Sequence, residues 1–203
     1  MNVLDWARKV QAIAHCGLAF THDHFDRKRY EELQELVAEL LTAELAVPIG
    51  EARKLFVHEP GYATPKVDVR GAVFKENKVL LVRELSDGRW SLPGGWADVN
   101  DTPSSAIERE IREESGYEAK AVKLAAVYDR RLHSHPPYLH HAYKLFFICD
   151  LTGGAAQTSN ETDGVDFFAL DALPELSTGR VTRGQIERLF EHDRRRDLPT
   201  EFD

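Results

Sequence analysis

Four glutamates crowd into seven residues of the sequence, at Glu108, Glu110, Glu113 and Glu114. If the segment is helical, with about 100° between successive residues, Glu110, Glu113 and Glu114 lie on or beside its apolar arc. Glu108 falls on the outer side, where it can pair with Arg112. Three carboxylates on a partly buried face repel one another, so at least one must be protonated at neutral pH unless a cation compensates. Hard divalent cations that bind oxygen, Mg²⁺ or Mn²⁺, would compensate best, and an ordinary solvated acidic helix is the alternative.

A Pro-Gly-Gly turn, ending in Gly94 and Gly95, precedes this helix. Glycines let the backbone approach a ligand closely, so a carbonyl can point at a metal and an amide at a phosphate. The sequence contains no GxxxxGK pattern and no GxGxxG pattern, so the turn is neither a P-loop nor a dinucleotide fingerprint. Thr102 can cap the helix, Pro103 suits its first position and Gly116 would end it.

The segment up to about Ala46 has the hydrophobic periodicity of two helices. Residues 23–26 supply the turn and capping types between them. A helical pair this short cannot bury both of its faces, so it must pack on the rest of the chain or on a second copy of itself. Residues 57–65 carry the proline and glycine of a linker. We therefore expect a helical extension at 1–60, for dimerisation or as a substrate lid, and a larger domain at 66–203.

After residue 65 the pattern changes to strands with two helices. The expected order is β-β-α-β-β-β-α without regular βαβ alternation, which indicates an α+β or sandwich-like domain built on a mixed sheet. The strands are expected at 67–74, 78–85, 121–132, 141–151 and 165–170, and the helices at 102–116 and 180–192.

Composition and charge narrow the classes of function. The 203 residues are 42% hydrophobic and 30% charged, as in a globular protein with a buried core. The formal net charge of −8 disfavours binding to nucleic acid or to an anionic membrane surface. Cys16 and Cys149 are far apart, and the N-terminal segment lacks the basic and apolar regions of a signal peptide. We therefore expect a soluble, cytoplasmic protein without a membrane span.

The turn and the acidic helix together resemble the signature of the Nudix hydrolases. That signature runs glycine, five residues, Glu, seven residues, then Arg-Glu-aliphatic-x-Glu-Glu-x-Gly-aliphatic. The matching positions are Gly95, Asp101, Arg109, Glu110, Ile111, Glu113, Glu114, Gly116 and Tyr117. Asp101 stands where the family usually has Glu, and Tyr117 where it usually has an aliphatic residue. The helical extension also resembles a subgroup that cleaves nucleoside diphosphates linked to another moiety, such as ADP-ribose or CDP-choline.

The resemblance implies a Nudix fold for residues 66–203, with a mixed sheet between helices. It also implies a metal site formed by the Gly94 carbonyl and the carboxylates of Glu110, Glu113 and Glu114. This site would hold Mg²⁺, with Mn²⁺ as a substitute. Glu110 and Glu114 would then take part in catalysis.

Four further residues complete the expected site. By the resemblance, Arg109 would position its neighbours, and an acidic residue from a later loop would act as base or ligand. Glu161 and Asp163 are the candidates, and we favour Glu161. Arg70 interrupts the first strand and is expected to face the substrate, as arginines commonly bind phosphate. The amide of Gly95 is expected to bind the substrate as well.

The expected reaction is hydrolysis of a phosphoanhydride in a nucleoside diphosphate derivative, by a homodimer. Two alternatives stay open. An RNA-directed hydrolase is disfavoured by the missing basic stripe, and a non-catalytic nucleotide sensor would be expected to lose the carboxylates. Four histidines, His133, His135, His140 and His141, are close in sequence, but their spacing matches no common zinc module. They are expected to form a loop near the substrate or a partner subunit.

Overall fold

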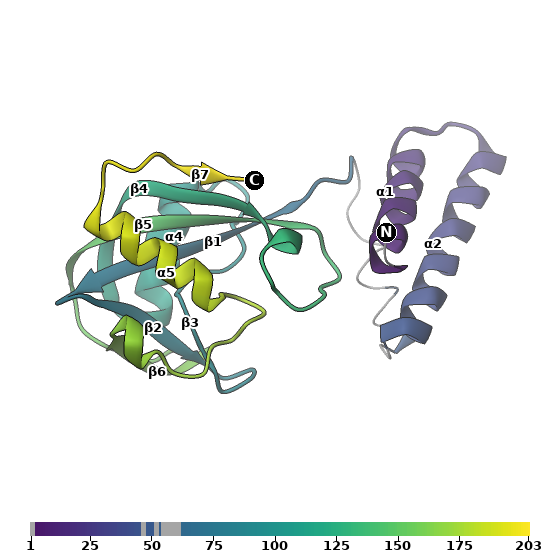
Figure 1. Ribbon diagram of the computed structural model, residues 1–203. Helices are drawn as coiled ribbons and strands as arrows, with labels where there is room; N and C mark the ends of the chain where they lie inside the picture. Colours follow the sequence, from purple (N-terminus) through teal and green to yellow (C-terminus); the bar gives the residue numbers. More distant parts are fainter. Residues whose placement is uncertain (1–2, 46–47, 51–52, 54–61) are drawn as a thin grey trace. The chain divides into compact units, whose positions relative to one another are not determined.

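The computed structural model describes residues 3–45, 48–50, 53 and 62–203. The chain divides into two compact units, residues 1–65 with 139–141 and residues 66–138 with 142–203 (Figure 1). Much of the predicted linker, at 57–61, lies outside the described residues.

The first unit contains a pair of helices, as the periodicity predicts: α1 (Val3–Phe20) and α2 (His24–Leu45). Asp23 caps α2, because its carboxylate accepts two backbone N–H groups of the first turn at 2.9 Å. The helices bury a small apolar cluster that includes Val37 and Leu41. Large apolar side chains stay exposed on both helices, namely Val3, Trp6, Ile13, Phe20, Phe25 and Leu36. No helix in the described residues is long and apolar enough to cross a lipid bilayer.

The second unit is built on a mixed sheet, which confirms the expected α+β class. Its strands are β1 (Lys66–Lys75), β2 (Lys78–Glu84), β3 (Trp90–Ser91), β4 (Tyr117–Asp129), β5 (Ala142–Gly154), β6 (Thr162–Phe168) and β7 (Glu201–Phe202). The strand order is β3-β2-β1-β5-β4-β7, and β6 pairs with β2. β1 is parallel to β5, whereas β1 and β2, and likewise β4 and β5, are antiparallel.

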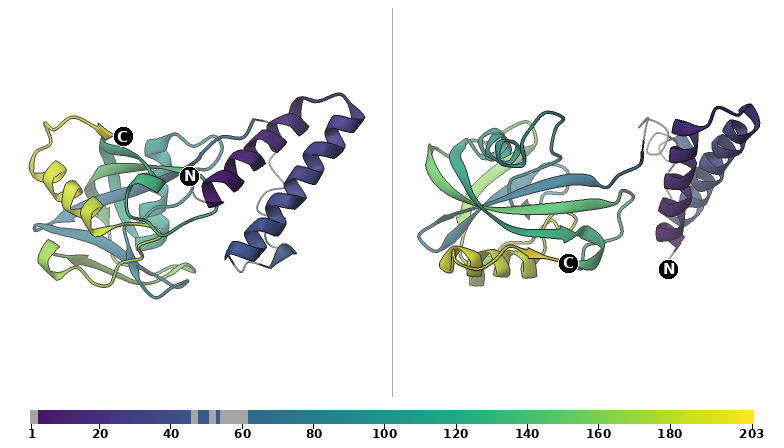
Figure 2. Two further views of the ribbon diagram at one scale, coloured as in Figure 1. Left: turned by 45° about the vertical axis from the view of Figure 1, so that its right-hand side comes forward. Right: turned by 90° about the horizontal axis from the view of Figure 1, so that it is seen from above.

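Two helices cover opposite faces of this sheet, α4 (Pro103–Ser115) and α5 (Arg183–Arg194) (Figure 2). Ile107 and Ile111 of α4 belong to the apolar core on one face. Phe190 of α5 belongs to the core on the other face. The sheet therefore lies between helices, as the Nudix resemblance implies.

The ends of α4 are set by the residues that the sequence predicts. Thr102 caps it and exchanges hydrogen bonds with Ser105, and Gly116 ends it in the left-handed conformation, at φ 73°. Gly71 of β1 lets α4 approach the sheet, because a Cβ there would lie 2.7 Å from Cδ1 of Ile111. These contacts fix the height and direction from which the glutamates of α4 project.

The strand limits differ from the prediction in the pair formed by β4 and β5. β4 begins at Tyr117, four residues before the expected strand, and β5 continues to Gly154. Tyr117 and Glu118 pair with Gly154 and Gly153, in a segment without an apolar run. The predicted strand at 121–132 also ends early, because Arg130–Leu132 form a short 3₁₀ turn. The strands β3 and β7 have only two residues each, so they are too short to show the alternation of side chains by which a strand is predicted from sequence.

Candidate active site

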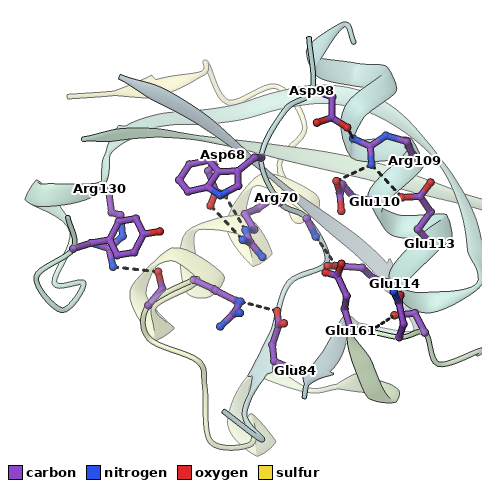
Figure 3. A pocket seen from close by; sticks show the side chains of 18 residues that line it. Asp68, Arg70, Glu84, Asp98, Arg109, Glu110, Glu113, Glu114, Arg130 and Glu161 are labelled. Carbon is purple, nitrogen blue, oxygen red and sulfur yellow. Dashed lines mark hydrogen bonds and ion pairs between the residues drawn. The ribbon is translucent and has the colours of Figure 1, made fainter. Parts of the chain in front are cut away.

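A cavity of about 850 Å³ lies in the second unit and is lined from both the sheet and the loops around it (Figure 3). Its wall contains most of the carboxylates expected from the sequence, together with Arg70, Gly94, Gly95 and Arg109. The acidic side chains that line it are Asp68, Glu84, Asp98, Glu110, Glu113, Glu114 and Glu161. In Figure 3, the glutamates of α4 lie at one end of the drawn pocket and Arg130 lies at the other.

Glu114 joins the acidic helix to the glycine turn. Its side chain is buried, and its Oε2 accepts the Gly94 N–H at 2.8 Å. Burial raises the pKa of Glu114 to about 8, although the positive charge of Arg70 and the Gly94 N–H both lower it. Gly94 has φ 140°, and a Cβ there would lie 2.0 Å from the carbonyl oxygen of Val69. Only glycine fits this position without moving the backbone of β1.

The glycine turn is held to β1 by its own backbone. Val69 N–H donates to the Gly95 carbonyl at 2.8 Å, and Gly71 N–H donates to the Pro93 carbonyl at 3.0 Å. The Gly94 carbonyl between them accepts no hydrogen bond from the described residues. That oxygen is therefore available to a ligand in the cavity, as the resemblance implies.

Arg109 forms hydrogen bonds with several of the acidic side chains around it. Its Nη1 donates to Glu110 at 2.9 Å and to Glu113 at 3.1 Å. Its Nε and Nη2 donate to one oxygen of Asp101, at 3.2 and 3.1 Å. Asp101 therefore holds Arg109, while Thr102 caps the helix. The positioning function expected for Arg109 is consistent with this geometry.

The three inward glutamates differ in burial more than the wheel suggests. Glu114 is buried, the Glu110 side chain is 14% exposed, and the Glu113 side chain is 52% exposed. Burial raises the pKa of Glu110, although Arg109 lowers it. Glu113 lies at the rim, because its position on the wheel is at the edge of the buried arc.

The prediction that Glu108 pairs with Arg112 is wrong. Glu108 lies 3.0 Å from the Lys120 ammonium and accepts the Ala121 N–H at 3.0 Å. The register of β4 against β5 shifts between Ala121 and Lys123. Glu108 binds the backbone beside this irregularity, so the neighbouring strand supplies its partners.

Arg70 lies on the cavity wall with a buried guanidinium that is already bonded. Its Nε and Nη2 donate to the two oxygens of Asp68, at 2.9 and 3.2 Å, and its Nη1 donates to the Leu92 carbonyl at 3.1 Å. The ammonium of the fully buried Lys144 lies 3.0 Å from Asp68, and burial lowers the pKa of Lys144 to about 8. The positive charge of Arg70 lowers the pKa of Glu114 and of other cavity carboxylates, so it favours their ionised forms. Its expected contact with the substrate stays a prediction.

Glu84 is a cavity residue that the sequence reasoning missed. It is 5% exposed, and its Oε1 lies 2.9 Å from Arg180 Nε, without the angle of a hydrogen bond. Burial raises the pKa of Glu84, although Arg180 and Arg70 lower it. The sequence did contain a signal for this residue, because Glu84 is an acidic residue at the last position of an apolar strand, β2.

The structure separates the two candidates for the later acidic residue. Glu161 lines the cavity, where Figure 3 shows it beside Glu114. Asp163 is not among the lining residues. It accepts two hydrogen bonds from Arg83, at 2.6 and 3.0 Å. The geometry therefore favours Glu161, the residue also preferred from the sequence.

The donors around the cavity fit a hard divalent cation. In the described part of the chain, no three Asp, Glu, His or Cys side chains converge on one point, and Glu110 and Glu113 both pair with Arg109. The oxygens nevertheless suit Mg²⁺: buried carboxylates with raised pKa values, the unbonded Gly94 carbonyl, and the Oε1 of Glu84, buried without a hydrogen bond. To bind a cation there, Glu110 and Glu113 would have to turn from Arg109 by a change of side-chain rotamers.

Two of the four clustered histidines, His133 and His135, bind separate partners. His133 Nε2 lies 2.7 Å from Asp203 Oδ1. His135 Nδ1 lies 2.7 Å from the Thr178 carbonyl, so it donates, and its Nε2 accepts from Gln185 at 3.0 Å. Burial lowers the pKa of His135 to about 4, which matches this neutral tautomer. These two histidines anchor the loop that carries Arg130 to the cavity.

Profiles of two protein families match the chain. The profile described as "UDP-X-like, N-terminal oligomerisation domain" matches residues 1–56. The profile described as "NUDIX domain" matches residues 64–190, which include every residue that lines the cavity.

Individual proteins are similar over most of the chain. A Bacillus subtilis protein, named as a candidate ADP-ribose pyrophosphatase, is 46% identical over 200 residues, which cover 98% of this chain and 96% of that protein. The crystal structure of a UDP-X diphosphatase is 34% identical, with a TM-score of 0.65, and the match covers 98% of this chain and 97% of that one. The crystal structure of an ADP-ribose pyrophosphatase from Streptococcus suis is 40% identical, also with a TM-score of 0.65, over 69% of this chain and 100% of that one.

Proposed function

Since the chain belongs to the Nudix hydrolase family, we propose that it hydrolyses the phosphoanhydride of a nucleoside diphosphate linked to another moiety, in a Mg²⁺-dependent reaction. Substrates of the ADP-ribose or UDP-X type are favoured, because relatives similar over nearly the whole chain carry these names. One observation carries the proposal: Glu110 and Glu114 meet the Gly94–Gly95 turn on the wall of a cavity. The cytoplasmic location expected from the sequence stays a prediction.

Nudix hydrolases generally use divalent metal ions. In this chain, the carboxylates of Glu110, Glu113 and Glu114 and the carbonyl of Gly94 would hold Mg²⁺, or Mn²⁺ in its place. The bound ion would neutralise the diphosphate and lower the pKa of a water molecule.

The chain's own residues prepare and complete this reaction. Arg109, held by Asp101, orients Glu110 and Glu113. Glu161, which is exposed on the cavity wall, would accept a proton from the attacking water. The Gly95 amide would bind a phosphate oxygen of the substrate.

A hydrolysis screen of the intact chain tests the proposed function. With Mg²⁺, we expect faster turnover of ADP-ribose, a UDP-sugar or CDP-choline than of a short 5′-triphosphorylated RNA, with a nucleoside monophosphate as a product. A chelator should abolish this turnover, and Mn²⁺ should restore it. The proposal is wrong if none of the diphosphate compounds is hydrolysed with either ion, or if the RNA is the best substrate.

We also infer that the helical extension at 1–60 joins two chains into a homodimer. Ile13 is 63% exposed, Phe20 66% and Phe25 68%, and such apolar exposure is costly on a free surface. The matching profile is described as an oligomerisation domain. This interpretation is favoured over a substrate lid because the exposed apolar residues occur on both helices.

Light scattering on the intact chain tests the dimer. The wild type is expected at twice the mass of one chain, and Ile13→Lys is expected to shift it toward the monomer, because a buried charge without a partner opposes association. Val99→Lys, at an exposed residue of the second unit, is the matched control and should leave the mass unchanged. A monomeric wild type would contradict the inference.

A further inference from the structure

Two aromatic side chains lie on the cavity wall and remain exposed there. Trp96 is 41% exposed and Tyr138 is 38% exposed, and both line the cavity. Trp96 follows the glycine turn, whereas Tyr138 comes from the loop after β4, so the fold brings them together from segments 42 residues apart. Neither residue belongs to the proposed metal site of Glu110, Glu113, Glu114 and Gly94.

The geometry of these rings suits a third flat ring. Their planes are inclined by only 24°, and their centroids are 6.5 Å apart, near the long end of the range for aromatic pairs. Atoms in van der Waals contact are about 3.5–4.0 Å apart, so the two rings do not cover each other's faces fully. A planar heteroaromatic ring in the cavity can therefore stack on one or both of them.

A buried arginine fixes the position of Tyr138. The Arg130 guanidinium lies 4.7 Å from the centre of the Tyr138 ring, and Arg130 is 6% exposed. It donates to the carbonyls of Pro136, at 2.9 Å, and of Gly179, at 3.3 Å. A ring held in this way loses little freedom when a ligand stacks on it, which favours binding.

We propose that Trp96 and Tyr138 form a stacking site for the nucleobase of the substrate. This proposal rests on the proposed function, which requires a nucleoside at one end of the diphosphate. Arg130, which holds Tyr138, lies at the end of the drawn pocket away from Glu110, Glu113 and Glu114 (Figure 3). The base therefore occupies one end of the cavity and the diphosphate the other, so base stacking sets the direction in which the substrate lies.

The test measures binding of products by calorimetry, with the intact chain and without a divalent ion. Wild type is expected to bind AMP or UMP more tightly than ribose 5-phosphate, which has no base. Trp96→Ala and Tyr138→Ala should each weaken binding of the nucleotide by roughly 5- to 150-fold, the range observed for base–aromatic stacking. Binding of ribose 5-phosphate should be unchanged in both variants.

Three control variants separate stacking from other roles. Trp96→Phe and Tyr138→Phe keep a ring and should bind the nucleotide within about threefold of wild type. Tyr62→Ala removes an exposed aromatic side chain outside the cavity and should have no effect.

Several results would overturn the proposal. They are wild-type affinity of both alanine variants for AMP and UMP, equal affinity of the wild type for ribose 5-phosphate and the nucleotides, no measurable binding of either nucleotide, or an equal loss of ribose 5-phosphate binding. The hydrolysis screen is independent of this test. Ring-dependent binding of AMP without turnover of any diphosphate compound would retain the stacking site and reject the proposed function.

Discussion

Glu114→Gln is expected to lower kcat by about 10²- to 10⁴-fold without unfolding the protein. The substitution removes a buried carboxyl group that a bound cation would hold in its ionised form. The fold should tolerate it, because burial raises the pKa of Glu114 to about 8, so a neutral side chain is already favoured at pH 7. The amide oxygen of glutamine can still accept the Gly94 N–H that Glu114 accepts at 2.8 Å. A loss of activity would then report on the chemistry of the site and not on its folding.

The measurements are kcat with ADP-ribose or the best substrate of the screen, and thermal unfolding in the presence of a chelator. Glu118→Gln is the matched control, since Glu118 is exposed on β4 and does not line the cavity. It should keep both kcat and the melting temperature. Retention of wild-type kcat by Glu114→Gln would remove Glu114 from the proposed catalytic and metal-binding groups.

Gly94→Ala is expected to destabilise the protein by about 3–5 kcal/mol, whereas Gly95→Ala is expected to cost less than about 1 kcal/mol. A Cβ at Gly94 would lie 2.0 Å from the Val69 carbonyl oxygen, in a backbone conformation with φ 140°. A Cβ at Gly95 would meet nothing closer than the Glu110 carboxyl group, at 3.4 Å. The two adjacent glycines therefore serve different purposes. Gly94 permits the close approach of the turn to β1, and Gly95 leaves space for the Glu110 side chain.

Chemical denaturation and kinetics of both variants test this difference. For Gly94→Ala, the free energy of unfolding should fall, and activity should fall with it. For Gly95→Ala, the free energy of unfolding should stay near that of wild type, while kcat falls because the methyl group restricts the movement of Glu110. Equal stability of the two variants would contradict the close approach of Gly94 to β1.

Local signals in the sequence predicted the helix that carries the carboxylates. Thr102 and Gly116 limit α4 as expected, because caps satisfy backbone groups within one turn and depend on neighbours in sequence. The apolar arc of α4 also predicted that Glu114 is buried. The strands at 66–75 and 78–84 were predicted from their runs of β-branched residues, which are also a signal between neighbours in sequence.

Contacts between distant segments were not predictable in this way. Glu108 pairs with Lys120, because β4 passes beside α4, and not with Arg112, its neighbour on the helix. Glu84 reaches the cavity because β2 ends beside the loop that carries Arg180. Such pairs depend on how the strands are ordered, and one sequence shows only spacing along the chain.

The sequence by itself determined the carboxylates, the glycine turn before them and the mixed α+β class. The helix and the strands follow from their periods, and the turn follows from its two adjacent glycines, so all of them depend on neighbouring residues. Only the tertiary structure decided what surrounds them. It turned Asp101 toward Arg109, buried Arg70 against Asp68, and placed Trp96 beside Tyr138. The physical reason is that side chains pair with whatever the packed fold brings within a few ångströms, whatever their separation in sequence.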